Sequence, residues 1–100
     1  MASRNQTLKV TKNNYQYLSD GFGVVKMGIF GSVAKDTDDE ESDVDIVVEF
    51  KNPIGLKFID LVDYLENLLQ RRVDLLTPDG IDNIRIKNIS DAIRKNIIYV

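Results

Sequence analysis

Residues 24–50 read VVKMGIFGSVAKDTDDEESDVDIVVEF and hold two apolar segments on either side of an acidic loop. The first segment, Val24 to Phe30, is short, mostly apolar and bounded by glycines, which predicts a β-strand. The second segment, Asp43 to Phe50, alternates in polarity as a half-buried strand does. Its two faces are Asp43, Asp45, Val47 and Glu49 on one side, and Val44, Ile46, Val48 and Phe50 on the other. We therefore expect two strands, the second with a polar face.

Helical periodicity flanks these strands on both sides. Leu8, Tyr15 and Leu18 recur at helical spacing, which favours a helix over residues 7–19. Between residues 53 and 70, apolar side chains recur every three or four positions, as in an amphipathic helix packed on a core. These apolar residues are Phe58, Leu61, Val62, Leu65, Leu68 and Leu69.

The C-terminal part predicts further short elements. Residues 72–76 are typical of a short strand, which Pro78 ends. Residues 97–100 are apolar enough for a terminal edge strand, and residues 81–93 indicate a broken helix with Ser90 as a cap. The alternation of helices and strands predicts a mixed α/β (α+β) fold: a small mixed β-sheet with helices packed on one side.

Composition restricts the function. The chain has 100 residues, so residues 1–100 are expected to form a single domain without a separate substrate-binding domain. It has no cysteine and no histidine, which excludes disulfides, thiolate catalysis, histidine-ligated metals and a Ser-His-Asp triad built from this chain. Thirteen Lys and Arg against sixteen Asp and Glu give a net charge of -3, which argues against direct nucleic-acid binding.

Hydropathy and chain length also predict the location and the assembly of the protein. No apolar run is long enough to span a membrane and the N-terminus lacks the apolar core of a signal peptide, so we expect a cytoplasmic protein. A domain of this size buries a modest share of its surface, so association with a partner or as a homodimer would stabilise it.

Two local features point to phosphate chemistry. Residues i and i+2 of a strand face the same way, so Asp43 and Asp45 project two carboxylates from one face. These charges repel each other unless a cation lies between them, and Mg²⁺ prefers carboxylate oxygens while keeping positions for phosphate and water. Gly31 lets the backbone approach a phosphate closely, and Ser32 adds a hydroxyl at the start of a helical turn. Each feature alone is common in turns and solvated strand edges, but together they favour phosphoryl or nucleotidyl transfer.

The same residues carry a family resemblance. Residues 27–35 followed by residues 42–48 resemble the minimal nucleotidyltransferases of the DNA polymerase β-like superfamily. The signature of that family is Gly-Ser, ten residues, then Asp-x-Asp, and residues 33–42 form the ten-residue spacer. Asp74, on the third expected strand, looks like the third carboxylate of the family. The resemblance covers nearly the whole chain from Gly23 onward.

The resemblance implies a reaction and a set of site residues. The chain would be an Mg²⁺-dependent nucleotidyltransferase that moves AMP from ATP to a hydroxyl, with release of pyrophosphate. The carboxylates would hold one or two Mg²⁺ ions, and Asp74 would also help to deprotonate the attacking hydroxyl. The catalytic and metal-binding residues would be Asp43, Asp45 and Asp74. The nucleotide phosphates would be bound by Gly31, Ser32 and Lys35.

The resemblance also implies a partner. Proteins of this kind look like antitoxins paired with a helical HEPN-type ribonuclease toxin, so the acceptor would be a tyrosine of that toxin. The chain departs from the family where Lys35-Asp36 replaces the usual Arg-Gly, and residues 36–45 hold seven of the sixteen acids. Lysine binds phosphate as a point charge without the two-pronged geometry of arginine. Two alternatives therefore stay open: an antitoxin that neutralises its toxin by binding alone, and nucleotidylation of a small molecule such as an aminoglycoside.

Overall fold

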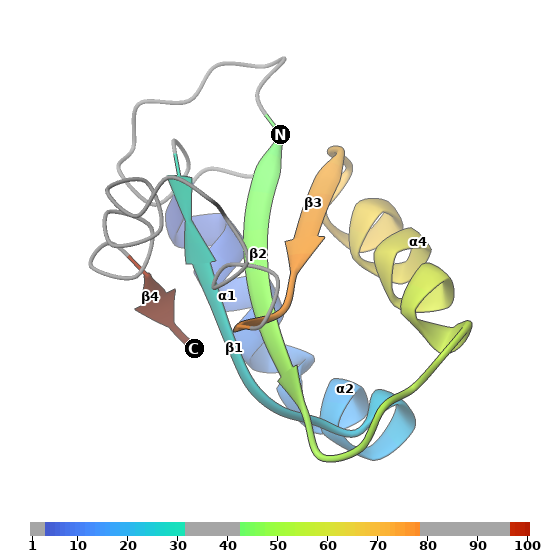
Figure 1. Cartoon of the computed structure of the whole chain (residues 1–100). Helices are drawn as coiled ribbons and strands as arrows, with labels where there is room; N and C mark the ends of the chain where they lie inside the picture. The colour runs from blue at the N-terminus through green and yellow to red at the C-terminus, as the bar shows by residue number, and fades with distance from the viewer. Residues whose placement is uncertain (1–3, 32–42, 79–96) are drawn as a thin grey trace, which may run out of the picture.

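The computed structural model describes residues 4–31, 43–78 and 97–100, and its strands form one four-stranded sheet. The strands are β1 (Val24–Phe30), β2 (Val44–Phe50), β3 (Val73–Leu76) and β4 (Ile98–Tyr99). Their order across the sheet is β3-β2-β1-β4 (Figure 1). β1 pairs antiparallel with β2 and β4, whereas β2 pairs parallel with β3. The predicted mixed sheet, including its terminal edge strand, is confirmed.

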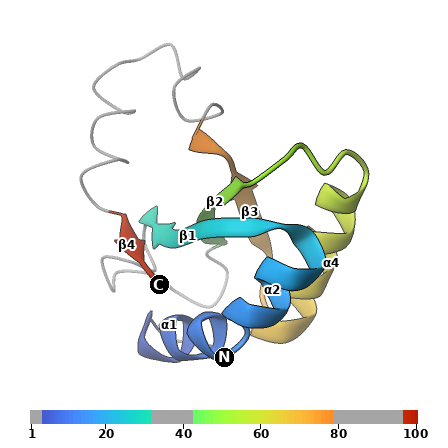
Figure 2. The same ribbon diagram turned by 90° about the horizontal axis from the view of Figure 1, so that it is seen from below.

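The helices of the described residues lie together on one face of this sheet (Figure 2). They are α1 (Arg4–Asn13), α2 (Tyr15–Phe22) and α4 (Lys57–Leu69). The predicted packing of helices on one side is therefore confirmed. None of the helices in the described ranges is both long and apolar enough to cross a membrane. The helix expected over residues 81–93, with its cap at Ser90, lies outside the described residues.

The prediction of one helix over residues 7–19 is wrong, because α1 and α2 are separate helices that meet at Asn14. The backbone of Asn14 has φ -101° and ψ 4°, which departs from helical geometry. Its side-chain amide donates to the carbonyl of Val10 at 2.8 Å and accepts from the Tyr64 hydroxyl at 3.1 Å. These two hydrogen bonds fix the Asn14 side chain at the junction between α1 and α2.

The long helix is four residues shorter at its start than the predicted range of 53–70, because α4 begins at Lys57. Gly55 has φ +57°, a left-handed conformation that cannot continue a right-handed helix. At the other end, Gln70 takes a left-handed conformation with φ +56° and ends the helix. The Glu66 carboxylate then accepts from the backbone N–H of Val73 at 3.0 Å, which ties the helix to the start of β3.

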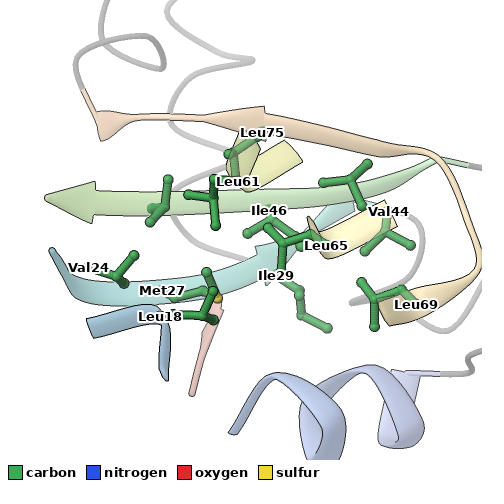
Figure 3. Packing of buried hydrophobic residues seen from close by; sticks show 12 residues of the cluster. Leu18, Val24, Met27, Ile29, Val44, Ile46, Leu61, Leu65, Leu69 and Leu75 are labelled. Atoms are coloured by element: carbon green, nitrogen blue, oxygen red, sulfur yellow. The ribbon is translucent and has the colours of Figure 1, made fainter. Parts of the chain in front are cut away.

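The hydrophobic core fills the space between the sheet and the helices. Leu61, Leu65 and Leu69 project from α4 toward the strands, one helical turn apart (Figure 3). They meet the apolar face predicted for β2, and Leu18 of α2 packs in the same cluster. The buried members of this core are Leu18, Val24, Met27, Ile29, Val44, Ile46, Val48, Leu61, Leu65, Leu69, Val73 and Leu75.

Truncation of the core side of α4 is expected to destabilise the fold strongly. Leu65 is 0% exposed, so Leu65→Ala removes buried methyl groups and leaves a cavity, at a cost of about 2–5 kcal/mol. Ile59 lies on the same helix but is 59% exposed, so Ile59→Ala serves as the matched control and should cost less than about 0.5 kcal/mol. Urea unfolding of both variants measures the difference. Equal losses would contradict the assignment of the core to this face of α4.

Candidate functional site

The sheet face opposite the helices, here called the site face, carries two of the residues predicted for chemistry, Asp45 and Asp74. Three cross-strand pairs of β1 and β2 lie on this face: Lys26 with Glu49, Gly28 with Val47, and Phe30 with Asp45. On the outer strands, Asp74 lies beside Asp45, and Tyr99 lies beside Gly28. The face is partly apolar, because Phe30 and Val47 form a small buried cluster with Leu76 and Ile97.

Two of the three predicted carboxylates lie directly beside each other. Asp45 of β2 and Asp74 of β3 are register partners in the parallel pair, on strands about 4.8 Å apart. Asp45 is half-buried, and Asp74 is exposed. Asp43 lies immediately before β2 and is also exposed. The parallel pairing thus brings the Asp-x-Asp motif next to the carboxylate that follows it by almost thirty positions.

The electrostatics of Asp45 reflect this arrangement. Burial, then the charges of Asp74 and Asp43, raise the pKa of the Asp45 carboxyl from its ordinary value of 3.8 to about 6. Loss of water and nearby like charges both disfavour the ionised form of a carboxyl group. The site therefore concentrates negative charge that a bound cation would relieve.

Gly31 packs against the Asp45 carboxylate at the exit of β1. Its φ of +72° is left-handed, and a Cβ built on it would collide with Oδ2 of Asp45 and lie 3.0 Å from its Cγ. A glycine is therefore required there for two reasons, the backbone conformation and the closeness of the carboxylate. Ser32 and Lys35, the other predicted phosphate-binding residues, lie outside the described residues.

The donor set fits a hard divalent cation that arrives with phosphates. Within the described ranges, no three acidic side chains are gathered closely enough to form a complete metal site on their own. Mg²⁺ does not need such a cage, because it is usually held by one or two carboxylates and completes its coordination with phosphate and water oxygens. The adjacent Asp45 and Asp74, with their excess negative charge, supply that type of ligand.

Sequence reasoning left a second group on the site face unassigned. The sequence allows Lys26 to face the site, but Gly23 and Gly28 make the alternation of this strand unreadable. In the structure, the register of β1 shifts between Val24 and Lys26. This irregularity leaves Val25 exposed, with its carbonyl accepting from the Tyr15 hydroxyl at 2.7 Å. Beyond it, the Lys26 ammonium lies 4.3 Å from the centroid of the Tyr99 ring. The alternation of β2, which puts Glu49 on the face of Asp45, was the available signal for this region.

Comparison with known proteins assigns the family. A family model described as a nucleotidyltransferase domain matches residues 12–100. The chain belongs to this nucleotidyltransferase family. The match includes β1, β2 and β3, so the elements that carry Gly31, Asp45 and Asp74 are elements of the family fold. The chain is accordingly a nucleotidyltransferase enzyme.

Individual relatives agree with this assignment. The protein adenylyltransferase MntA of Thermococcus cleftensis is 40% identical over 84 residues, which cover 83% of this chain and 81% of the relative. The solved structure of a protein described as a minimal nucleotidyltransferase superposes with a TM-score of 0.74 at 28% identity, over 97% of this chain and 95% of that one. A toxin–antitoxin structure with AMP-PNP shares the fold, with a TM-score of 0.63 at 18% identity over 98% of this nucleotidyltransferase and 72% of that chain.

Proposed function

We propose that this nucleotidyltransferase transfers AMP from ATP to a hydroxyl of a partner protein. The observation that carries the proposal is the half-buried Asp45 carboxylate, which lies beside Asp74 on one side and against the backbone of Gly31 on the other. A pair of carboxylates next to a glycine turn suits a triphosphate that brings its own cation. The names of the relatives as adenylyltransferases support AMP as the transferred group.

In the proposed reaction, the residues of the chain divide into two roles. Asp43, Asp45 and Asp74 would hold Mg²⁺, which when bound would neutralise phosphate charge and lower the barrier to attack at the α-phosphorus. Asp74 accepts the proton of the attacking hydroxyl, and its exposed position leaves room for an acceptor from another molecule. The bond from the hydroxyl oxygen to the α-phosphorus forms, the bond to the bridging oxygen of the β-phosphate breaks, and pyrophosphate leaves.

The end of the site at Gly31 is proposed to hold the departing phosphates. The absence of a side chain lets backbone amides reach phosphate oxygens, and Ser32 and Lys35 are proposed to add a hydroxyl and a positive charge. Positioning and charge neutralisation supply most of the catalysis in reactions of this type.

The proposed acceptor is a tyrosine of a HEPN-type ribonuclease toxin, which would make this chain the antitoxin of a pair in the cytoplasm. The fold shared with a toxin–antitoxin structure that contains an ATP analogue supports this choice. The acidic residues 36–45 would suit the basic surface of an RNA-binding partner. A cytoplasmic location fits a reaction that consumes ATP.

The test is the intact mass of the neighbouring gene's product after co-expression with this chain or with its Asp43→Asn variant. We expect mass increments of one or more adenylyl groups with the wild-type chain and none with the variant, because the variant lacks a metal-binding carboxylate. Asp63→Asn, at an exposed position of α4, is the matched control and should leave the increments unchanged.

A stable complex without any mass increment would contradict transfer to that partner. It would favour the second candidate, an antitoxin that neutralises its toxin by binding alone. The observation that favours this candidate is the replacement of the family's Arg-Gly by Lys35-Asp36, followed by further acidic residues. Toxin neutralisation that survives Asp43→Asn would separate the two functions.

A further inference from the structure

A small pocket opens on the site face, two to four residues along β2 from Asp45. Its volume is about 170 Å³. Drug-sized ligands occupy pockets of roughly 300–1,000 Å³, so this one admits a single ring system rather than a whole nucleotide. Its lining comes from β1, β2 and β4 and from the residues after β3. The lining residues are Lys26, Val47, Glu49, Pro78 and Tyr99.

The walls of this pocket combine an aromatic ring with opposite charges. The ring of Tyr99 is 49% exposed, and the Lys26 ammonium covers it at 4.3 Å from the centroid. Glu49 is the register partner of Lys26, so a hydrogen-bond acceptor stands beside a hydrogen-bond donor. The floor is Val47, which is 4% exposed. A flat ring with both donors and acceptors on its edge matches such walls.

The position of the pocket relative to Asp45 matches the length of a nucleotide. Asp45, Val47 and Glu49 follow one another on the same face of β2. With a rise of about 3.3 Å per residue, Val47 lies about 7 Å beyond Asp45 and Glu49 about 13 Å beyond it. Gly31 lies at the opposite side of Asp45, because β1 runs from Lys26 toward Gly31 antiparallel to β2. Along β2, the order is therefore Gly31 at the proposed phosphate end, then the Asp45 carboxylate, and then the pocket.

We propose that this pocket holds the purine base of the nucleotide and selects adenine. The base stacks on Tyr99, the exocyclic amino group of adenine donates to the Glu49 carboxylate, and Lys26 turns from the ring to donate to a ring nitrogen. This assignment rests on the proposed function, since it needs the α-phosphate at Asp45. It adds the residues that recognise the base to those proposed for the phosphates and the metal.

An aromatic side chain of the acceptor would use the pocket less well. A phenol ring has one polar atom, its hydroxyl, which must reach the α-phosphorus near Asp45. The charged pair of Lys26 and Glu49 lies at the far end of the pocket from Asp45, where such a ring has no polar atom. The edge of a purine offers hydrogen bonds to both an ammonium and a carboxylate, which a phenol ring does not, so a purine is the better occupant.

Gly28 makes the pocket possible by letting β4 lie close to β1. A Cβ on Gly28 would lie 2.6 Å from Cγ2 of Ile97 and 3.1 Å from Cδ1 of Tyr99. The missing side chain therefore leaves the room that the Tyr99 ring occupies beside Lys26. The pairing of β4 with β1 places Tyr99 directly beside Gly28.

Calorimetric titration of the whole chain with ATP, inosine triphosphate and inorganic tripolyphosphate in Mg²⁺ tests the assignment. Stacking on an aromatic ring is worth enough that Tyr99→Ala should weaken ATP binding by about tenfold or more, whereas tripolyphosphate, which has no base, should bind as before. Tyr99→Phe keeps the ring and should stay within about twofold of wild type. Tyr17→Ala, at another exposed tyrosine, is the matched control.

Substitution of Glu49 tests base recognition independently of the Tyr99 ring. Inosine replaces the amino group of adenine by a carbonyl, so the wild-type chain should bind inosine triphosphate about tenfold more weakly than ATP. Glu49→Gln, an isosteric change at an exposed position, should remove most of that preference.

Three results would overturn the assignment while leaving the proposed function intact. These are unchanged ATP affinity in Tyr99→Ala, equal weakening of ATP and tripolyphosphate, and an unchanged preference for ATP over inosine triphosphate in Glu49→Gln. A wild-type chain that binds neither ATP nor tripolyphosphate would overturn the proposed function and this assignment together.

Discussion

Replacement of Asp45 by asparagine is expected to abolish nucleotidyl transfer and, at the same time, to stabilise the nucleotide-free protein. The asparagine side chain would keep the shape of the aspartate but remove the charge that is proposed to bind Mg²⁺, so the rate should fall on the order of a thousandfold or more. Transfer is measured by the adenylyl mass increment of the acceptor over time.

The gain in stability follows from the raised pKa of Asp45. This pKa lies at about 6 in the folded protein against an ordinary value of 3.8, so the folded state holds the proton more tightly than the unfolded chain. The free energy of unfolding therefore falls as the pH rises from about 4 to about 6, and it keeps this full loss at higher pH. Asparagine removes this cost, worth about 1 kcal/mol after allowance for solvent screening, or roughly 4–8 °C in melting temperature.

Thermal unfolding at two pH values tests whether Asp45→Asn raises or lowers the stability. Asp45→Asn should melt higher than wild type at pH 8 and close to wild type near pH 4, where the carboxyl is largely protonated. Asp63→Asn, at an exposed position of α4, should change neither the melting temperature nor the transfer rate much. A lower melting temperature for Asp45→Asn at pH 8, or retained transfer, would contradict the assigned charge cluster.

Gly31→Ala is expected to have the second largest effect, a loss of transfer on the order of a hundredfold. The added Cβ would collide with the Asp45 carboxylate, so the carboxylate or the backbone must move from the position that is proposed to bind the metal and phosphates. Displacements of about 1 Å in a catalytic arrangement can cost a hundredfold in rate. The measurement is the rate of adenylyl transfer at saturating ATP, together with ATP affinity.

Gly23→Ala separates this collision from backbone strain. Gly23 has the same φ of +72°, but a Cβ there would meet no atom within 4 Å. Both substitutions place alanine in a left-handed conformation, which costs about 1–2 kcal/mol of stability. Only Gly31→Ala should also lose transfer. Equal activity of the two variants would show that Gly31 does not support the carboxylate as described.

Much of the fold could be predicted from local patterns, because the core depends on them. Val24–Phe30 is a strand over the predicted range, and the alternation of β2 places Val44, Ile46 and Val48 in the core. Of the two errors in the helices, the late start of α4 follows from the left-handed Gly55, whereas the other involves a tertiary contact. The break at Asn14 is held by Tyr64, fifty positions away, and no helical periodicity reveals that contact.

The site was only partly accessible to the same reasoning. Alternation places Asp43 and Asp45 on one face, but the neighbour of Asp45 depends on the parallel pairing of β2 with β3, which brings in Asp74. The side of the sheet that carries Lys26 depends on the register shift in β1, and the closeness of Tyr99 depends on the order of the strands. These are properties of the assembled sheet, so the pocket that is proposed to hold the base could not be found before the fold.

Transfer of AMP is tested by comparing ATP labelled at the α-phosphate with ATP labelled at the γ-phosphate. Each is incubated with Mg²⁺, the purified chain and its partner protein, and label bound to protein is counted. We expect α-label to become attached to the partner while γ-label leaves as pyrophosphate, and Asp45→Asn to attach neither. Protein-bound γ-label would indicate phosphoryl transfer, and no bound label from the wild-type chain would mean that it does not transfer AMP to this partner. Either result would rule out the proposed transfer of AMP to this protein.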